Sequence, residues 1–191
     1  MKTGLFFGSF NPIHNGHLAL ANYMAEFTDL NQIWFIVSPH NPLKEKASLL
    51  ADYHRFELVN IAIGDYPKFK SSNIEFTLPK PSYTIDTLTY LSEKYPNHEF
   101  VPIVGSDNLH SLTKWKNYRQ LIEYYQIYVY PRPGFDGGEF RKHPRFTFVN
   151  APVMEISSSF IRDAIKAKKD VRFFVPLKVN EYIMEMHFYE K

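Results

Sequence analysis

Residues 8–17 read Gly-Ser-Phe-Asn-Pro-Ile-His-Asn-Gly-His, and they lie between two apolar segments. The apolar run before them, Leu5–Phe7, predicts a buried strand, and the periodic run Leu18–Phe27 predicts a helix. The order is therefore strand, tight turn and helix, with two histidines where the helix begins. Free backbone N–H groups at a helix N-terminus bind anions, and glycines let a ligand approach the backbone. This stretch predicts a phosphate-binding loop of the kind that binds nucleotides.

The rest of the chain alternates short apolar runs with helical patterns. The runs predict strands at residues 33–37, 73–76, 100–104, 127–130 and 146–149, and the periodic segments predict helices at 52–63, 84–91, 118–125, 157–168 and 176–188. Such alternation predicts an α/β fold, with a doubly wound, mainly parallel, Rossmann-like sheet and helices on both faces. We expect one domain spanning residues 1–191, with a small helical C-terminal part from about residue 157.

Composition narrows the class of protein. Hydrophobic residues make up 45% of the 191 positions, which is enough for a sizeable core. The net charge of +2 is too small to indicate the basic surface that binds nucleic acid. The absence of cysteine excludes disulfides and thiolate chemistry. The first residues lead into a strand rather than a signal peptide, and no apolar run is long enough to span a membrane. We therefore expect a cytoplasmic protein with no nucleic acid or membrane partner.

His14 and His17 allow three interpretations. Spaced three residues apart at the start of a helix, they point to one side. A metal pair would need a third ligand at suitable spacing, and the HExxH pattern is absent. One imidazole could instead cap or pack the helix. Glycine, proline and the helix start coincide with the imidazoles, which favours phosphate binding.

A second anion site is predicted at Ser157–Arg162. Serines at a helix start offer hydroxyls and free N–H groups, and Arg162 in the following turn can hold two phosphate oxygens at once. An ordinary serine cap beside a surface arginine is the alternative.

Both segments resemble the nucleotidyltransferase superfamily whose hallmark is the sequence HxGH. Residues 8–17 carry that motif, and Ile156–Arg162 resembles the family's ISSTxIR box, with Ser159 in place of threonine. The resemblance implies that His14, His17 and Arg162 are catalytic: the histidines stabilise the transferring phosphoryl group, and Arg162, with Lys44, holds the outgoing phosphates. It also implies an ATP-binding set made of Gly8, Ser9, Phe10, Gly16, Lys44, Ile156, Ser157, Ser158 and Ser159.

The loop that holds Lys44 departs from the family pattern. Many relatives carry Pro-Pro-His-Lys here, whereas in this chain His40 precedes the proline. Lys44 is carried over as a phosphate-binding charge, with a solvated loop lysine as the alternative, and His40 is left without a role.

The middle of the chain resembles nicotinate-mononucleotide adenylyltransferases. The similarity runs through Pro81–Leu88, Ile103–Leu109, Trp115 and Arg132–Gly134. It implies that Trp115 stacks on the pyridine ring and that Thr84 and the backbone N–H of Lys116 hold the nicotinate carboxylate. The implied mononucleotide-binding set is Thr84, Gly105, Asp107, Trp115, Lys116 and Arg132.

Physical chemistry supports the tryptophan assignment, because the pyridine ring is cationic and tryptophan offers the best aromatic face for a cation. A half-buried structural role for Trp115 is the alternative. Trp34 lies within a predicted central strand and is expected in the core.

The reaction implied joins ATP and nicotinate mononucleotide to give nicotinate adenine dinucleotide and pyrophosphate. Its nucleophile is a phosphate oxygen that is already ionised, so no general base is required. We expect Mg²⁺ to be held mainly by the triphosphate and water, without a protein metal site.

Other readings remain at this point. The acceptor could be nicotinamide mononucleotide or phosphopantetheine, and a different class would be a non-catalytic nucleotide-binding module. A fragment of a tRNA synthetase would also carry an HxGH motif, but the sequence has no KMSKS-type loop, which argues against that class. A homo-oligomer is left open. The glycine-rich residues 131–145 are expected to form a mobile loop.

Overall fold

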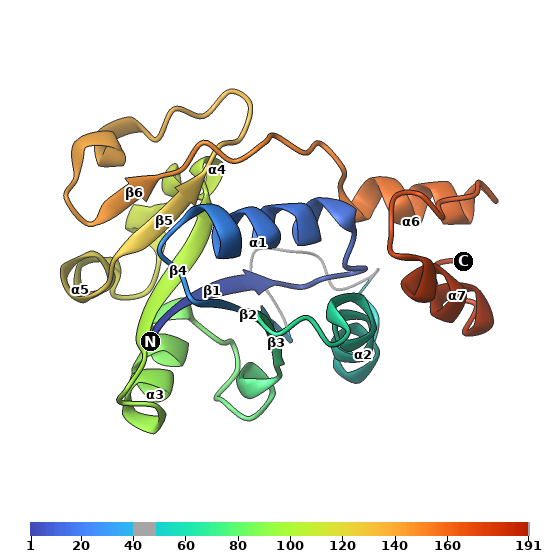
Figure 1. Ribbon diagram of the computed structural model, residues 1–191, viewed down its shortest axis with the longest axis horizontal. Coiled ribbons are helices and arrows are strands. Elements are labelled where there is room, and N and C mark those ends of the chain that lie inside the picture. Colours follow the sequence, from blue (N-terminus) through green and yellow to red (C-terminus); the bar gives the residue numbers. More distant parts are fainter. Residues whose placement is uncertain (40–48, 191) are drawn as a thin grey trace.

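The computed structural model describes residues 1–39 and 49–190. Within them, six strands form one parallel sheet in the order β3-β2-β1-β4-β5-β6 (Figure 1). The strands are β1 (Lys2–Gly8), β2 (Gln32–Val37), β3 (Phe69–Ser72), β4 (Glu99–Gly105), β5 (Ile127–Tyr130) and β6 (Phe146–Phe148). The order reverses between β1 and β4, which is where such sheets bind ligands, beyond the carboxyl ends of their strands.

Helices cover both faces of this sheet, so the predicted doubly wound α/β class is confirmed. The α-helices are α1 (Asn15–Phe27), α2 (Asp52–Ile63), α3 (Thr84–Lys94), α4 (Ser106–Leu109), α5 (Tyr118–Tyr124), α6 (Ser158–Lys166) and α7 (Leu177–Glu185). Short 3₁₀ helices are η2 (Ile74–Phe76), η3 (Leu112–Lys114) and η4 (Gly138–Lys142).

Each face has its own core. On one face, Phe6 and Phe35 of the central strands pack with α1, α2 and the C-terminal helices α6 and α7. On the other face, Leu5 and Trp34 pack with α3, α4 and α5. Figure 1 shows α6 and α7 at one end of the molecule, with α7 next to α2. Residues of α6 and α7 share a hydrophobic cluster with the sheet, so this C-terminal part is packed onto the rest of the chain.

The predicted strand at residues 73–76 is wrong. The strand is the preceding segment, β3, and residues 74–76 form η2. β3 reads Phe-Lys-Ser-Ser and lies at the sheet edge, so it lacks the apolar run that marks a central strand. Glu75 in η2 is buried because its carboxylate accepts hydrogen bonds from two hydroxyls, which an apolar pattern cannot reveal.

The start of α1 and the capping residue of α3 also need comment. α1 begins at Asn15, three residues before the predicted start, because His14 caps it. α3 begins at Thr84, as the helical spacing predicts, but Tyr83 rather than Thr84 occupies the capping position. Residues 131–145 contain η4, with Phe140 buried, and a bridge between Arg132 and Phe135.

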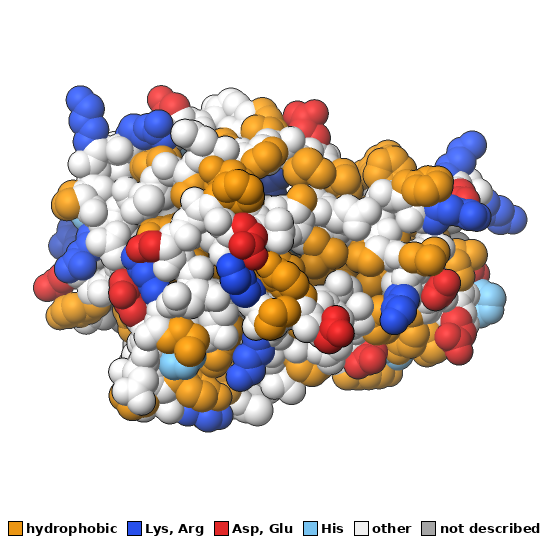
Figure 2. All heavy atoms as spheres, in the orientation of Figure 1, with side chains coloured by type: hydrophobic (Ala, Val, Ile, Leu, Met, Phe, Trp, Pro, Cys, Tyr) orange, Lys and Arg blue, Asp and Glu red, His pale blue; other side chains and the backbone are white. Residues whose placement is uncertain are grey.

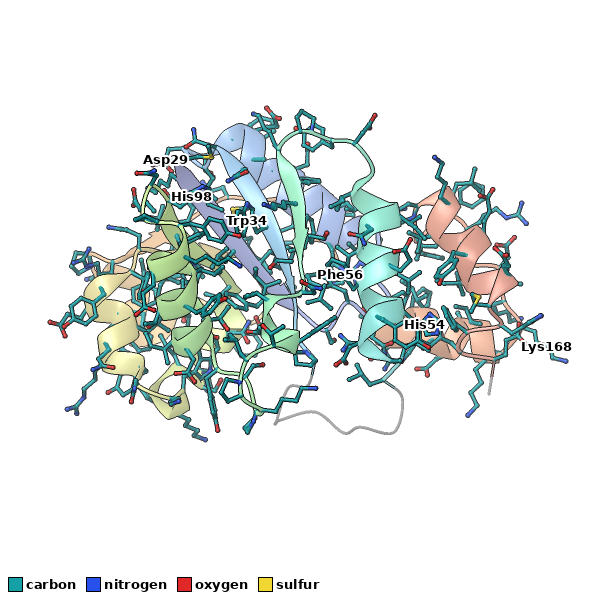
Figure 3. The ribbon with its side chains drawn as sticks, turned by 90° about the horizontal axis from the view of Figure 1, so that it is seen from below. Asp29, Trp34, His54, Phe56, His98 and Lys168 are labelled. Atoms are coloured by element: carbon teal, nitrogen blue, oxygen red, sulfur yellow. The ribbon has the colours of Figure 1, made fainter. Side chains whose placement is uncertain are left out.

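A polar network lies at the amino ends of the strands, away from the loops that follow them. Thr3 is buried there, with its hydroxyl 2.9 Å from Nδ1 of His98 and accepting from Gln32 at 3.0 Å. Trp34 is 3% exposed and packs beside His98, which confirms its predicted place in the core (Figure 3). No helix of the described segments is long and apolar enough to cross a membrane.

Candidate active site

The sheet brings the predicted site segments to one edge. Gly8 ends β1, Gly105 ends β4 and Tyr130 ends β5, and these three strands are neighbours in the sheet. The loops that follow them therefore meet. A small hollow of about 30 Å³ at this edge is lined by residues from three stretches of the chain, 6–20, 130–132 and 152–156: Phe6, His14, Gly16, His17, Leu20, Tyr130, Pro131, Arg132, Pro152, Met154 and Ile156.

The two histidines cap α1 reciprocally. Nδ1 of His14 accepts a hydrogen bond from the backbone N–H of His17 at 3.4 Å, and Nδ1 of His17 accepts from the backbone N–H of His14 at 3.3 Å. Their rings stack with centroids 3.7 Å apart. Capping boxes normally pair serine or threonine with glutamate or glutamine. Here imidazoles do the same work, so the capping and phosphate interpretations of these residues are compatible.

This box fixes which ring nitrogens can act on a ligand. Because each Nδ1 is an acceptor, a neutral ring carries its proton on Nε2. Burial, and to a lesser extent the positive charge of Arg132, lower the pKa of His14 to about 4. His14 is therefore neutral near pH 7 and offers a single N–H donor from Nε2. It cannot act as a cationic acid at that pH.

Phe10 and the glycines shape this loop. The Phe10 ring is 2% exposed and packs edge-on against His17, with centroids 5.1 Å apart, so any contact with a ligand is left to its backbone. A Cβ on Gly8 would lie 2.8 Å from the Phe10 ring. A Cβ on Gly16 would lie 3.1 Å from the His14 ring. Gly8 thus makes room for the Phe10 ring, which packs against His17, and Gly16 makes room for the His14 ring.

The start of α6 is joined to the same loop. Ser157 caps α6, since its hydroxyl accepts from the backbone N–H of Phe160 at 3.1 Å. The Ser158 hydroxyl donates to the carbonyl of Pro12 at 2.9 Å. Arg162 donates to the carbonyl of Asn11 at 2.8 Å and to the Ser159 hydroxyl at 3.2 Å. The N-termini of α1 and α6 therefore lie on one loop, although about 140 residues separate them in sequence.

Arg55 is a site-building residue that the sequence analysis missed. Its guanidinium is fully buried and donates to the carbonyls of Ser9, Ser38, Pro39 and Leu50 and to the carboxylate of Asp52. It thereby ties the loop after β1 to the loop after β2. The available signal was an arginine at helical spacing from Leu58 and Val59, on the buried face of α2.

Gly105, Asp107 and Arg132 form a second polar group at the sheet edge. Oδ1 of Asp107 and Nε of Arg132 are buried and lie 3.9 Å apart, and among the described residues neither atom has a hydrogen-bond partner. A Cβ on Gly105 would lie 2.2 Å from that carboxylate oxygen, so a side chain at this position would displace the Asp107 carboxylate. A hydroxyl that contacted both atoms from one side could donate to Asp107 and accept from Arg132. Sugar hydroxyls have that property.

The segments of Thr84 and Trp115 lie side by side. Nζ of Lys116 is 3.0 and 2.7 Å from the two carboxylate oxygens of Asp86 in α3, and it lies 4.9 Å from the Tyr83 ring centroid. Trp115 is half-buried and packs against the core under α3 and α5. Trp115 therefore has a partly structural role, as the alternative interpretation expects, and part of its surface stays accessible to a ligand.

A buried carboxylate orders the start of α3. Glu75 accepts hydrogen bonds from Thr87 at 2.7 Å and from Ser82 at 3.1 Å, on either side of Thr84.

The predicted residues Lys44 and His40 lie outside the described residues. Among those that are described, no group of three or more His, Cys, Asp or Glu side chains could hold a metal ion.

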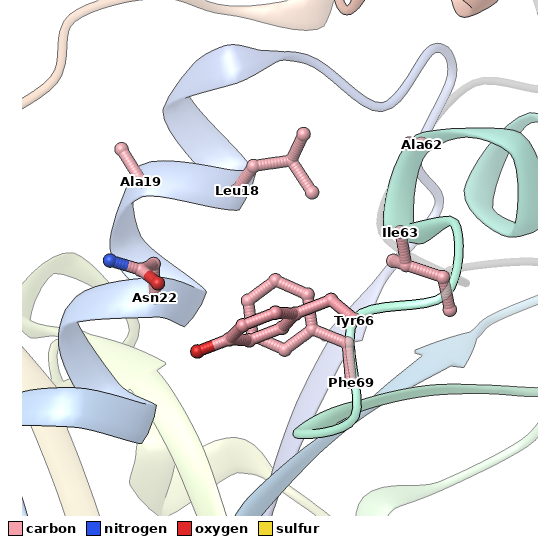
Figure 4. A pocket seen from close by; sticks show the side chains of 7 residues that line it. All are labelled: Leu18, Ala19, Asn22, Ala62, Ile63, Tyr66 and Phe69. Carbon is pink, nitrogen blue, oxygen red and sulfur yellow. The ribbon is translucent and has the colours of Figure 1, made fainter.

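A larger hollow, of about 390 Å³, lies apart from these residues. It is lined by Leu18, Ala19, Asn22, Ala62, Ile63, Tyr66 and Phe69 (Figure 4). Figure 2 shows hydrophobic side chains gathered on this face between α1 and α2. The lining offers one amide and one phenol and no charged group, so it lacks the chemistry of the smaller hollow.

The fold is that of the doubly wound α/β proteins that bind nucleotides, with the N-termini of α1 and α6 close to its switch point. Residues 5–164 match the model of the cytidylyltransferase-like family. A probable nicotinate-nucleotide adenylyltransferase of Flavobacterium psychrophilum is 54% identical over 193 residues, covering 100% of both chains. One of Cytophaga hutchinsonii is 52% identical, covering 99% of this chain and 98% of the relative. The chain belongs to the cytidylyltransferase-like family and, within it, to the nicotinate-nucleotide adenylyltransferases.

Solved structures agree in fold. The nicotinic acid mononucleotide adenylyltransferase of Plasmodium falciparum, complexed with NaAD, superposes with a TM-score of 0.83. The superposition covers 99% of this chain and 97% of that one at 21% identity. At 21% identity, this similarity is evidence for the fold alone.

Proposed function

We propose that this chain joins ATP and nicotinate mononucleotide to give nicotinate adenine dinucleotide and pyrophosphate, a step of NAD biosynthesis. One observation carries the proposal: two helix N-termini and two imidazole Nε2 donors converge on one loop, with Arg162 bound to the same loop. That is a site for an extended polyphosphate. The relatives that cover the whole chain carry the name of this activity.

The chemistry follows from the donors. A phosphate oxygen of the mononucleotide attacks the α-phosphorus of ATP, a new P–O bond forms, and the bond to pyrophosphate breaks. The nucleophile is ionised at neutral pH, so the chain needs no base, in keeping with a neutral His14. His14 and His17 donate to the oxygens where charge develops, and Arg162, with Lys44, holds the departing pyrophosphate.

Magnesium accompanies ATP in this proposal. Mg²⁺ takes oxygen ligands and commonly keeps several waters and substrate phosphates. Because the described residues offer no ring of carboxylates, the ion fits here through phosphate oxygens and water. Its contribution is to neutralise phosphate charge. We further propose a cytoplasmic location, because ATP, one of the two substrates, is supplied there.

We assign the binding of the mononucleotide to two groups of residues, Asp107 with Arg132 and Thr84 with Trp115. The ribose hydroxyls of a nucleotide hydrogen-bond to Asp107 and Arg132, and the cationic pyridine ring stacks on Trp115. Thr84 and the backbone N–H of Lys116 receive the carboxylate. Arg132 also lines the hollow with both histidines, so it lies where the two substrates meet.

A pyrophosphate-release assay tests the function. The chain is given ATP and, in separate reactions, nicotinate mononucleotide, nicotinamide mononucleotide and phosphopantetheine, and the products are identified by mass. We expect the highest kcat/KM with nicotinate mononucleotide. His17→Ala, prepared in the same way, controls for contaminating enzymes. Activity with phosphopantetheine alone, or with none of the three, would overturn the proposal.

A further inference from the structure

The phosphate-binding loop has a support that comes from the far end of the chain. Asn11 lies in this loop and is 3% exposed. Its Oδ1 accepts hydrogen bonds from the Tyr189 hydroxyl at 2.9 Å and from the backbone N–H of Leu50 at 3.2 Å. Its own carbonyl accepts from Arg162 at 2.8 Å. One buried residue thus links four segments, and Tyr189 is the most distant of them.

Tyr189 is itself held firmly. The neighbouring Phe188 is buried and packs edge-on against His54, with centroids 4.6 Å apart, and its N–H donates to the carbonyl of Ile183 at 3.0 Å. His54 lies where α2 meets the C-terminal helices (Figure 3). Tyr189 has a φ of 65°, a left-handed conformation that a non-glycine residue rarely adopts. Its surroundings must hold it there.

The charges around the phenol are those of the site. Burial raises the pKa of Tyr189 far above its usual value, against the opposing effect of the Arg162 and Arg55 charges. The hydroxyl therefore stays protonated and remains a donor to Asn11. Those two arginines are the ones that bind the loop, so Tyr189 lies among the residues that shape it.

We propose that Tyr189 is a positioning residue for phosphate binding: its hydroxyl fixes Asn11, and Asn11 fixes the carbonyl that orients Arg162. The inference rests on the proposed function in so far as Arg162 holds the phosphates of ATP. Loss of this hydroxyl removes one of the hydrogen bonds that hold Asn11 and leaves that of Leu50. The loop is then held less tightly at the residue whose carbonyl binds Arg162. Arg162 then spends less time facing the phosphates.

Tyr189→Phe is the variant that tests this, because it removes one oxygen and keeps the ring. The matched control is Tyr182→Phe, which removes a hydroxyl 3.4 Å from Nδ1 of His54 in the same C-terminal part, away from the loop. ATP affinity is measured by calorimetry without an acceptor, together with Tm and the KM of each substrate.

For Tyr189→Phe we expect the Kd of ATP to rise about fivefold, the loss of one neutral hydrogen bond. The KM of the mononucleotide should stay within about twofold of the wild-type value, since Arg162 acts on ATP. Tyr182→Phe should leave the Kd of ATP unchanged, whatever it does to Tm. In an Asn11→Ser background, Tyr189→Phe should have no further effect.

A purely structural role predicts something else. If the two Tyr→Phe variants lower Tm to similar extents and both keep wild-type ATP affinity, the inference is wrong. If Tyr189→Phe does not fold, Asn11→Ser carries the test, and normal ATP affinity in that variant overturns it. Because ATP binding is measured without an acceptor, a wrong acceptor assignment would leave this result readable.

Discussion

The loop around His14 and the segment around Trp115 are the two halves of the proposed active site, and they are anchored differently. The phosphate half, residues 8–17 and 157–162, is joined by part-buried hydrogen bonds, with the buried residues Arg55 and Asn11 as the links. The acceptor half, residues 84–88 and 115–116, is joined by the Lys116–Asp86 ion pair, whose side chains are 43% and 42% exposed.

The difference teaches where this fold needs rigidity. Donors that face developing charge are effective only if they are already in place, because reorganising them in the transition state would cost much of their benefit. Recognition of the acceptor tolerates adjustment. We therefore expect large catalytic losses from changes in the phosphate half and smaller, substrate-specific losses from changes in the acceptor half.

The largest effect is expected from His17→Ala. Removing a donor that acts in the transition state lowers kcat by about 10²- to 10³-fold, while the Kd of ATP, measured by calorimetry, changes little. His17→Gln is the control, because glutamine can fill the same position of a capping box. It should restore Tm and leave kcat low. Near-normal turnover of His17→Ala would refute the role.

The next effect concerns acid stability. His14 titrates at about 4 in the folded chain and near 6.5 when unfolded. The unfolded chain therefore binds a proton first as the pH falls, so the stabilisation present above pH 6.5 is lost between pH 6.5 and 4. The loss is on the order of 3 kcal/mol.

Urea unfolding between pH 4 and 8 measures this loss. His14→Asn is the comparison, because asparagine is a good N-cap but does not titrate. Its free energy of unfolding should fall less steeply than that of the wild type over the same range. Identical pH slopes would show that His14 is not the group responsible.

A smaller and more selective effect is expected in the acceptor half. Trp115→Ala should raise the KM of nicotinate mononucleotide about tenfold, since a desolvated cation–π contact contributes up to about 2 kcal/mol. The KM of ATP should not change. Trp115→Phe keeps an aromatic face and should lose less. An unchanged KM for the mononucleotide in the alanine variant would leave Trp115 with a structural role alone.

The smallest effect is expected from the ion pair. Exposed pairs contribute about 0–1 kcal/mol, so Lys116→Met should change the KM of the mononucleotide by less than about threefold. Asp86→Asn should give the same small change. A tenfold rise in Lys116→Met alone would mean that the lysine side chain, rather than its backbone N–H, contacts the carboxylate.

Local patterns predicted more of the fold than of the site. The central strands and α2 follow from apolar runs and helical spacing, which are properties of neighbouring residues. The edge strand β3 was missed because exposure on one side leaves it polar. Motifs placed the histidines, the serines and Arg162 on the correct elements.

The supports of the site could not be predicted in the same way. Arg55, Glu75 and Tyr189 act through carbonyls, hydroxyls and an amide that are distant in sequence. Such partners become visible only when the chain is folded. The sequence can suggest a buried arginine by its helical position, but it does not say which loops that arginine joins.

The sheet order also bears on how the enzyme comes to be active. β1 pairs with β2 and with β4, and its partner in β4 is about 97 positions away. The Asn11–Tyr189 contact spans 178 positions. Contacts between distant residues carry a large loop-closure entropy and form slowly. The loop that binds phosphate should therefore be among the last parts to become ordered during folding, and a partly folded chain should have no activity.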